Sequence, residues 1–351
     1  MPKSILKRLK KEQTPLIDGN IATFIWQGEH TPKLVGDFTG WDAGNSIALK
    51  KSNQGVWTYQ LAFPSDAYIE YAFIDGEETL TDPNNSHRTP NGMGATNNYF
   101  YMTDYTPTNL VKKDKNIPHG IVRSYPVSTD YLITGKHRII HLYQPPVNEP
   151  VPLLVVWDGQ DYLHRAHLND IVDNLIAQER IRPIALALVN NGGQKSRHVE
   201  YSCNDATLGF LMTDVLPQAT KQLNLINIRT NPGAFGVVGA SMGGLMALYT
   251  GTRIPQVFGN VLSQSGAFSW TDMDMVVFDL LEHGERRPLK IWMDVGIYDI
   301  PGLLESNRRM YQLLSQRGYP ATYREYNAGH NYPAWRDDIW RGLETLFGFE
   351  K

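Results

Sequence analysis

The sequence predicts a two-part protein of the α/β class, in which a small all-β sandwich precedes a larger α/β domain. Three patterns in its 351 residues carry this prediction. Short alternating apolar runs, separated by Gly, Pro, Asp and Asn, fill about the first hundred residues and are typical of sandwich strands. Longer apolar runs then alternate with helical patterns, as in a sheet covered by helices. Between one such strand and its helix lies a glycine-rich corner that holds one serine.

The front module is predicted from runs that alternate apolar and polar residues at 22–26, 57–61 and 68–73. We place this module at residues 16–103. Lys, Asp, Thr and two prolines dominate residues 104–118, which predicts a linker. The α/β domain is then expected at residues 119–351, opening with two antiparallel strands at 120–126 and 138–143.

The corner Gly239–Gly244 has the sequence of a nucleophile elbow. It follows the apolar run Phe235–Val238 and opens the helical stretch Leu245–Thr252. A serine in such an elbow has a strained backbone, and its neighbours are glycines because side chains there would collide with the adjacent strand and helix. Ser241 is therefore predicted to be the nucleophile of a hydrolase or acyltransferase with an α/β-hydrolase fold.

A serine nucleophile needs a histidine base and a carboxylate that orients the histidine. In the α/β-hydrolase fold the acid and then the histidine follow the serine in the chain. Asp299 comes after the predicted strand Leu289–Val295, at the end where open sheets place their chemistry, and is the first choice for the acid. Glu305, in the next helical pattern, is the alternative acid. His330 lies on a glycine-bearing loop after the following strand and is the predicted base.

Further motifs lie at residues 155–163, 197–201, 261–268, 296–299 and 329–335. Together with the elbow, and in this order, they resemble the esterase family of α/β-hydrolases that includes enterochelin esterases, feruloyl esterases and mycolyltransferases. The resemblance covers the second half of the chain. It implies that Ser241 is the nucleophile, His330 the base and Asp299 the acid.

An acyl-transfer site also needs N–H donors aimed at the developing oxyanion. The N–H of Met242, directly after the serine, is one predicted donor. The second is expected from the loop after an early strand, which gives Gly159 or Gln160 after the apolar run 153–157.

The resemblance places residues 197–201 beside the active-site cleft. Arg197 is predicted either to bind a substrate carboxylate or phenolate, or to form an ion pair that holds a loop. Glu200 in the same segment and Phe268, as an apolar wall, complete the predicted substrate contacts.

The front module has its own resemblance. Its segments at 35–41, 55–57, 74–76 and 82–84 resemble early-set immunoglobulin-like modules related to glycogen-binding domains. Two roles follow from this resemblance, which are glycan binding and the shaping or covering of the active-site mouth.

Composition excludes several classes of protein. The one cysteine, Cys203, excludes an intrachain disulfide and is expected to be a passive thiol. The net charge is −3 and the basic run Lys7–Lys11 lacks interleaved aromatics, so we expect a solvated tail and no nucleic-acid partner. No secretory segment and no run of about eighteen apolar residues is present, which predicts no membrane contact and a cytoplasmic location. Metal-ligand spacing is absent, so neither a metal nor another cofactor is expected.

The first functional hypothesis is a serine esterase that forms an acyl-enzyme on a small-molecule or glycan ester. The expected cytoplasmic location favours a siderophore ester, as in enterochelin esterases. Feruloyl or acetyl carbohydrate esters are the alternative substrates, and acyl transfer is the alternative reaction at the same site. A noncatalytic glycan-binding protein is the third hypothesis, and the oligomeric state is not readable from the sequence.

Overall fold

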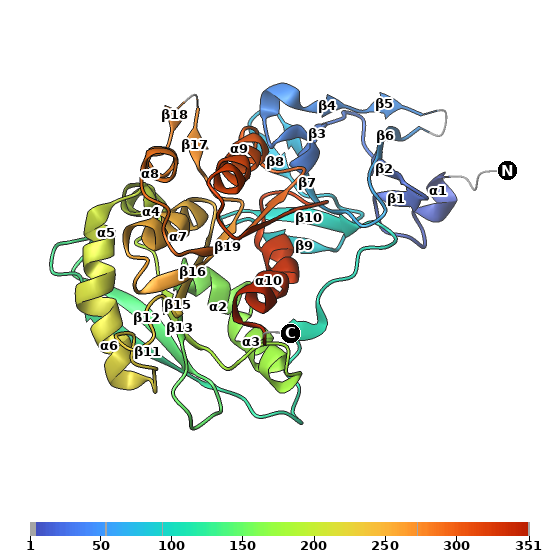
Figure 1. The fold of residues 1–351 in the computed structure, drawn as a ribbon. Helices are drawn as coiled ribbons and strands as arrows, with labels where there is room; N and C mark the ends of the chain where they lie inside the picture. The colour runs from blue at the N-terminus through green and yellow to red at the C-terminus, as the bar shows by residue number, and fades with distance from the viewer. Residues whose placement is uncertain (1–4, 53–54, 93, 272, 350–351) are drawn as a thin grey trace. The chain divides into compact units, whose positions relative to one another are not determined.

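A computed structural model describes residues 5–52, 55–92, 94–271 and 273–349 (Figure 1). The first residues of the predicted tail and the last two of the predicted α/β domain lie outside this description. Internal contacts divide the chain into two compact units. Unit 1 runs to Pro107 and adds two short later segments, Gly296–Pro301 and Tyr326–Ala334. Unit 2 contains the remaining residues.

Unit 1 is built on two antiparallel sheets. One has the order β1 (Leu16–Asp18), β2 (Ile21–Trp26), β6 (Trp57–Ala62), β5 (Lys50–Lys51). The other has the order β4 (Ile47–Ala48), β3 (Lys33–Gly36), β7 (Tyr68–Asp75), β10 (Thr96–Tyr101), β9 (Arg88–Pro90), with β8 (Glu78–Leu80) paired to β7. The three strands predicted for the front module are present as β2, β6 and β7.

Aromatic side chains from both sheets fill the core of this sandwich. Phe24 of β2 packs edge-on against Tyr71 of β7 and Phe100 of β10, with ring centroids 5.0 and 5.7 Å apart. All three side chains are buried. Short helices lie at α1 (Ile5–Arg8), η1 (Asp37–Thr39) and η2 (Ala43–Asn45). The predicted all-β module is therefore confirmed.

Unit 2 contains nearly all of an eight-stranded mixed sheet. Its order is β11 (Ile121–Ser128), β12 (His137–Gln144), β14 (Ala185–Val189), β13 (Leu153–Trp157), β15 (Phe235–Ala240), β16 (Phe258–Gln264), β19 (Lys290–Gly296), β20 (Ala321–Tyr326). Strands β11 and β12 are antiparallel, as predicted, whereas β14, β13, β15, β16 and β19 run parallel. The last residues of β19 and β20 belong to unit 1.

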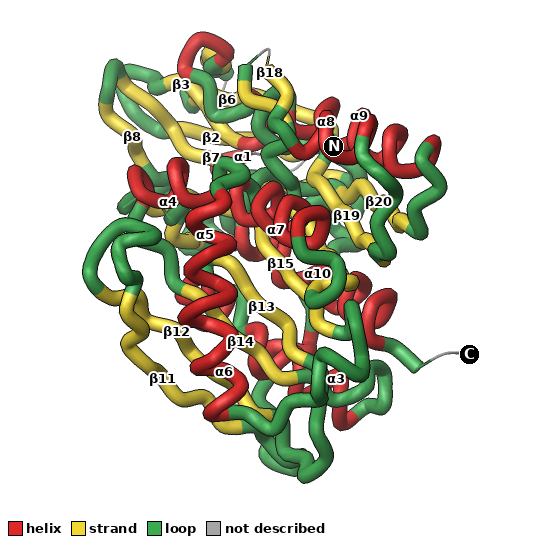
Figure 2. Tube along the Cα trace, turned by 60° about the vertical axis from the view of Figure 1, so that its left-hand side comes forward, coloured by secondary structure: helices red, strands yellow, loops and turns green. Residues whose placement is uncertain are grey.

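Helices cover both faces of this sheet. Helices α5 (Asp205–Phe210) and α6 (Leu216–Gln222) lie on one side, and α2 (Gly159–His164), α3 (Leu168–Ala177) and α10 (Tyr332–Phe347) on the other (Figures 1 and 2). The remaining helices are η3 (Asn109–Val111), α4 (Gln194–Tyr201), the π-helical turn Leu211–Val215, α7 (Met242–Arg253), α8 (Val277–His283) and α9 (Leu303–Gln316). Because both faces are covered, every residue of β13, β14, β15 and β16 is buried.

Candidate active site

Ser241 has the backbone of a nucleophile elbow. It lies between β15 and α7 with φ 59° and ψ −123°, a conformation that is strained for any residue with a side chain. Its N–H donates to Gln264 O at 2.8 Å, and its carbonyl accepts from Ala267 N at 3.1 Å. The neighbouring strand end and its loop therefore hold Ser241 in this conformation.

The glycines of the elbow are required by close backbone approach. A Cβ placed on Gly239 would lie 2.3 Å from the carbonyl oxygen of Gly243. A Cβ on Gly244 would lie 2.8 Å from Ser263 Oγ and 3.0 Å from Gln264 O. These are the collisions that the sequence pattern predicts.

A buried ion pair is hydrogen-bonded to the backbone directly before Ser241. Arg197 of α4 donates from Nε and Nη2 to the two carboxylate oxygens of Asp158, at 2.8 and 2.7 Å. The same Nη2 also donates to Ala240 O, at 3.1 Å, directly before Ser241. The Asp158 side chain is 1 % exposed, and Asn191 Nδ2 donates to it at 2.6 Å. Of the two interpretations of Arg197, the structure contains the ion pair, and Asp158 is a partner that the sequence analysis did not identify.

The other two predicted substrate contacts are buried within unit 2. Glu200 pairs with Arg138 at 2.8 Å, and both side chains are only 4 % exposed. Phe268 is completely buried in the main core of unit 2. Since neither side chain reaches the surface, the reaction proposed below gives no role to Glu200 or Phe268.

The predicted oxyanion donors begin two helices that follow neighbouring strands. Strands β13 and β15 are paired in parallel, with Val156 opposite Val238, so α2 and α7 start at the same edge of the sheet. Met242 is the first residue of α7, and Gly159 and Gln160 are the first two residues of α2. Their N–H groups precede the first hydrogen bonds within each helix and are therefore suited to bind an anion.

His330 and Asp299 form a hydrogen-bonded pair in unit 1. His330 Nδ1 and Asp299 Oδ1 are 2.7 Å apart. The backbones of the two loops are also joined, because Tyr298 N donates to Ala328 O at 3.1 Å. Glu305, the alternative acid, lies in the first turn of α9.

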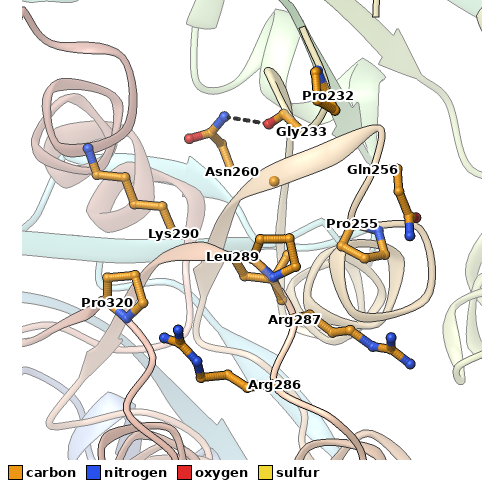
Figure 3. Close-up of a pocket in the computed structure, with 12 residues that line it drawn as sticks. Pro232, Gly233, Pro255, Gln256, Asn260, Arg286, Arg287, Leu289, Lys290 and Pro320 are labelled. Carbon is orange, nitrogen blue, oxygen red and sulfur yellow. Dashed lines mark hydrogen bonds between the residues drawn. The ribbon is translucent and has the colours of Figure 1, made fainter. Parts of the chain in front are cut away.

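The opposite edge of the sheet carries the pocket drawn in Figure 3. It has a volume of about 590 Å³ and is lined by residues next to the amino ends of β15, β16, β19 and β20, among them Arg286, Arg287 and Lys290. Asn260 Nδ2 donates to Gly233 O at 3.2 Å in its wall. Since open α/β sheets place their chemistry at the carboxyl ends of the strands, this pocket is not our candidate active site.

In the part of the chain that the structure describes, no group of three or more His, Cys, Asp and Glu side chains is arranged to hold a metal ion. The helices of the same residues include none that is long and apolar enough to cross a membrane.

Siderophore esterases are among the known proteins that are similar to this chain. An iron(III) enterobactin esterase of Dickeya dadantii is 30% identical over 60% of this chain and 51% of its own length. An iron(III) salmochelin esterase of Escherichia coli O6:H1 is 25% identical over 94% of this chain and 88% of its own. The chain spans about half the length of the curated enterobactin esterases that it matches.

Similarity to solved structures extends over both units in one case and over 69% of the chain in another. The enterobactin esterase of Shigella flexneri, determined in the presence of enterobactin, has a TM-score of 0.78 at 19% identity and covers 99% of each chain. A ferulic acid esterase of Anaeromyces mucronatus has a TM-score of 0.57 at 15% identity and covers 69% of this chain and 96% of its own. These similarities show the fold, which is an α/β-hydrolase fold preceded by an all-β module.

The sequence also matches a protein-family model. Residues 133–346, more than half of the chain, match the family model described as "Putative esterase". This segment includes the elbow, the ion pair beneath it and the hydrogen-bonded His330 and Asp299. The chain therefore belongs to the esterase family within the α/β-hydrolases.

Proposed function

We propose that the protein is a serine esterase that hydrolyses a carboxylic ester through an acyl-enzyme. The observation that carries the proposal is the strained backbone of Ser241. Such strain is retained at a strand-to-helix corner where the serine hydroxyl must be exposed for attack. His330 is the proposed base, and its hydrogen bond to Asp299 supports Asp299 as the acid that orients it.

Each residue has a defined role in the proposed reaction. Ser241 Oγ attacks the ester carbonyl while His330 accepts its proton and then returns it to the leaving alcohol. The hydrogen bond from Nδ1 to Asp299 fixes the tautomer in which Nε2 accepts that proton. The N–H of Met242 and that of Gly159 or Gln160 stabilise the oxyanion. Water then attacks the acyl-enzyme by the same steps, which releases the acid.

A siderophore ester is the proposed substrate. The salmochelin esterase aligns over 94% of this chain, and the Shigella flexneri enterobactin esterase covers 99% of it, including the front module. The ferulic acid esterase covers only 69% of the chain. A substrate class shared with the relatives that possess both units is therefore favoured over feruloyl or acetyl sugars. A cytoplasmic location stays a prediction from the sequence.

A substrate panel with two serine variants tests the proposal. We expect hydrolysis of a catecholate siderophore triester to exceed that of feruloyl sugars, acetylated sugars and nitrophenyl esters. Ser241→Ala should lose about 10⁶-fold in kcat, as other serine hydrolases do without their nucleophile. Ser315→Ala, which changes an exposed serine of α9, is the matched control and should retain wild-type activity. Full hydrolysis by Ser241→Ala would refute the mechanism, and transfer to an added alcohol in preference to water would identify an acyltransferase.

A further inference from the structure

We infer that the all-β module positions the catalytic residues, because it supports the loops that carry His330 and Asp299, with Asp37 as the positioning residue. The histidine loop is residues 327–331 and the acid loop is residues 296–301. The inference rests on the proposed function, since that proposal gives these two loops their part in the reaction. All contacts used below lie within unit 1.

The start of the histidine loop is hydrogen-bonded to the module. Tyr68 N, at the beginning of β7, donates to Asn327 O at 2.9 Å. The side chain of Asn327 donates in turn to Asp66 Oδ1 at 2.5 Å. The next residue, Ala328, is buried in a cluster with Tyr68. The module therefore fixes the position of the first residues of the histidine loop by hydrogen bonds and packing.

Asp37 then supports the loop directly before His330. The backbone of Gly329 lies so close to the Asp37 carboxylate that a Cβ on Gly329 would be 2.1 Å from Asp37 Cγ. Asp37 itself is fixed on both sides. Trp41 Nε1 donates to its Oδ1 at 2.9 Å, and Glu70 N donates to its Oδ2 at 2.8 Å. A rigid, buried carboxyl thus limits where the backbone next to His330 can lie.

The acid loop rests on the same module. The ring of Tyr298 packs against Phe63, with centroids 5.7 Å apart and an interplanar angle of 65°. Pro301 packs on Gly40, where a Cβ would lie 2.7 Å from the proline ring. The acid loop also meets the histidine loop, since a Cβ on Gly296 would be 2.1 Å from Ala328 O. Both catalytic loops and the module therefore form one packed body.

The charge of Asp37 is compatible with this role. Burial, followed by the nearby charge of Glu70, raises the pKa of Asp37 well above its usual value, and the charge of Asp299 acts in the same direction. Because burial favours the neutral form of Asp37, this residue adds less negative charge beside the His330–Asp299 pair than an exposed aspartate would.

Asp37→Asn, compared with Asp82→Asn, tests the inference. Asp82 is the matched control because it is also a buried carboxylate of the module, but it accepts hydrogen bonds from Thr14 and Tyr71 at 2.6 and 2.7 Å. Among the residues that the structure describes, it has no hydrogen bond to either loop. Asp37→Asn should lower kcat about 10²-fold while KM stays within about 2-fold, since a displacement of about 1 Å in a catalytic group costs this much. Asp82→Asn should destabilise the module but keep kcat within about 2-fold of wild type. An equal loss of kcat in the two variants would overturn the positioning role.

A reciprocal pair tests the contact itself. Gly329→Ala should lower kcat because the new methyl meets Asp37, and Asp37→Gly removes that obstacle. The double variant should therefore be no slower than the slower single variant. Multiplicative losses would show that the two positions act independently and would overturn the inference.

Hydrogen exchange separates this inference from the proposed function, because it needs no turnover. Amides of residues 327–331 should exchange faster in Asp37→Asn than in wild type, and at the wild-type rate in Asp82→Asn. Unchanged exchange in Asp37→Asn would overturn the positioning of the histidine loop by Asp37, even if the protein is an esterase. Full activity of Ser241→Ala would instead overturn the proposed function.

Discussion

Removal of Arg197 should destabilise the protein and also disturb the elbow. Arg197→Met keeps much of the side-chain volume but leaves the buried Asp158 carboxylate without its bidentate partner. Breaking a buried ion pair by removing one partner costs about 3–5 kcal/mol. Asn191 still donates to Asp158, so the lower end, about 3 kcal/mol, is expected. The variant also loses the hydrogen bond to Ala240 O, next to the nucleophile.

Arg138→Met is the matched control for this experiment. It breaks a second buried ion pair of unit 2, the one between Arg138 and Glu200. Among the described residues, neither member of this pair has a hydrogen bond to the elbow. Urea denaturation at 25 °C should give a similar loss of unfolding free energy for both variants. The rate at which a fluorophosphonate labels Ser241 should fall in Arg197→Met alone.

Two results would refute this reasoning. One is an unfolding free energy of Arg197→Met within about 1 kcal/mol of wild type, because the pair would then contribute as little as a surface ion pair. The other is a raised KM with normal stability and normal labelling, which would make Arg197 a substrate ligand.

Three further predictions test the site and its surroundings. Gly239→Ala should abolish labelling of Ser241, because its methyl would lie 2.3 Å from a backbone oxygen, whereas Gly243→Ala, whose methyl meets a carboxylate oxygen at 3.0 Å, should slow labelling only in part. Asp299→Asn should lower kcat by about 10⁴-fold and Glu305→Gln by less than about 3-fold; the reverse order would make Glu305 the acid. Burial raises the pKa of Cys203 to about 12, so its thiol stays protonated at pH 8, and iodoacetamide should alkylate it only after unfolding in urea; rapid reaction of the folded protein would contradict this.

The elbow was predictable from the sequence because its causes are local. Gly239, Ser241 and Gly244 are close in the chain, and the collisions that exclude side chains arise from the helix that follows and from β16, the next strand in the chain. The pairing of Asp299 with His330 was predictable from chain order, since each follows a strand of the same sheet. In both cases the backbone topology already restricts where these residues lie.

The supports of the site were not predictable in the same way. Asp158 lies in the loop that was predicted to provide the second oxyanion donor, but its partner Arg197 is 39 residues away and two roles for that arginine were open. Asp37 belongs to the segment 35–41, which resembles early-set immunoglobulin-like modules. Nothing in either segment indicates which distant loop it contacts, and such information exists only in the packed structure.

The seat of the histidine loop also has a consequence for how activity is acquired. Asp66 and Asn327, which are hydrogen-bonded, are separated by 261 residues. Closing so long a loop is entropically costly, whereas the strands of the front module all lie within residues 16–101 and pair with one another. The module can therefore fold before the histidine loop packs against it. During refolding, esterase activity should return after secondary structure does, because the contact that completes the site spans most of the sequence.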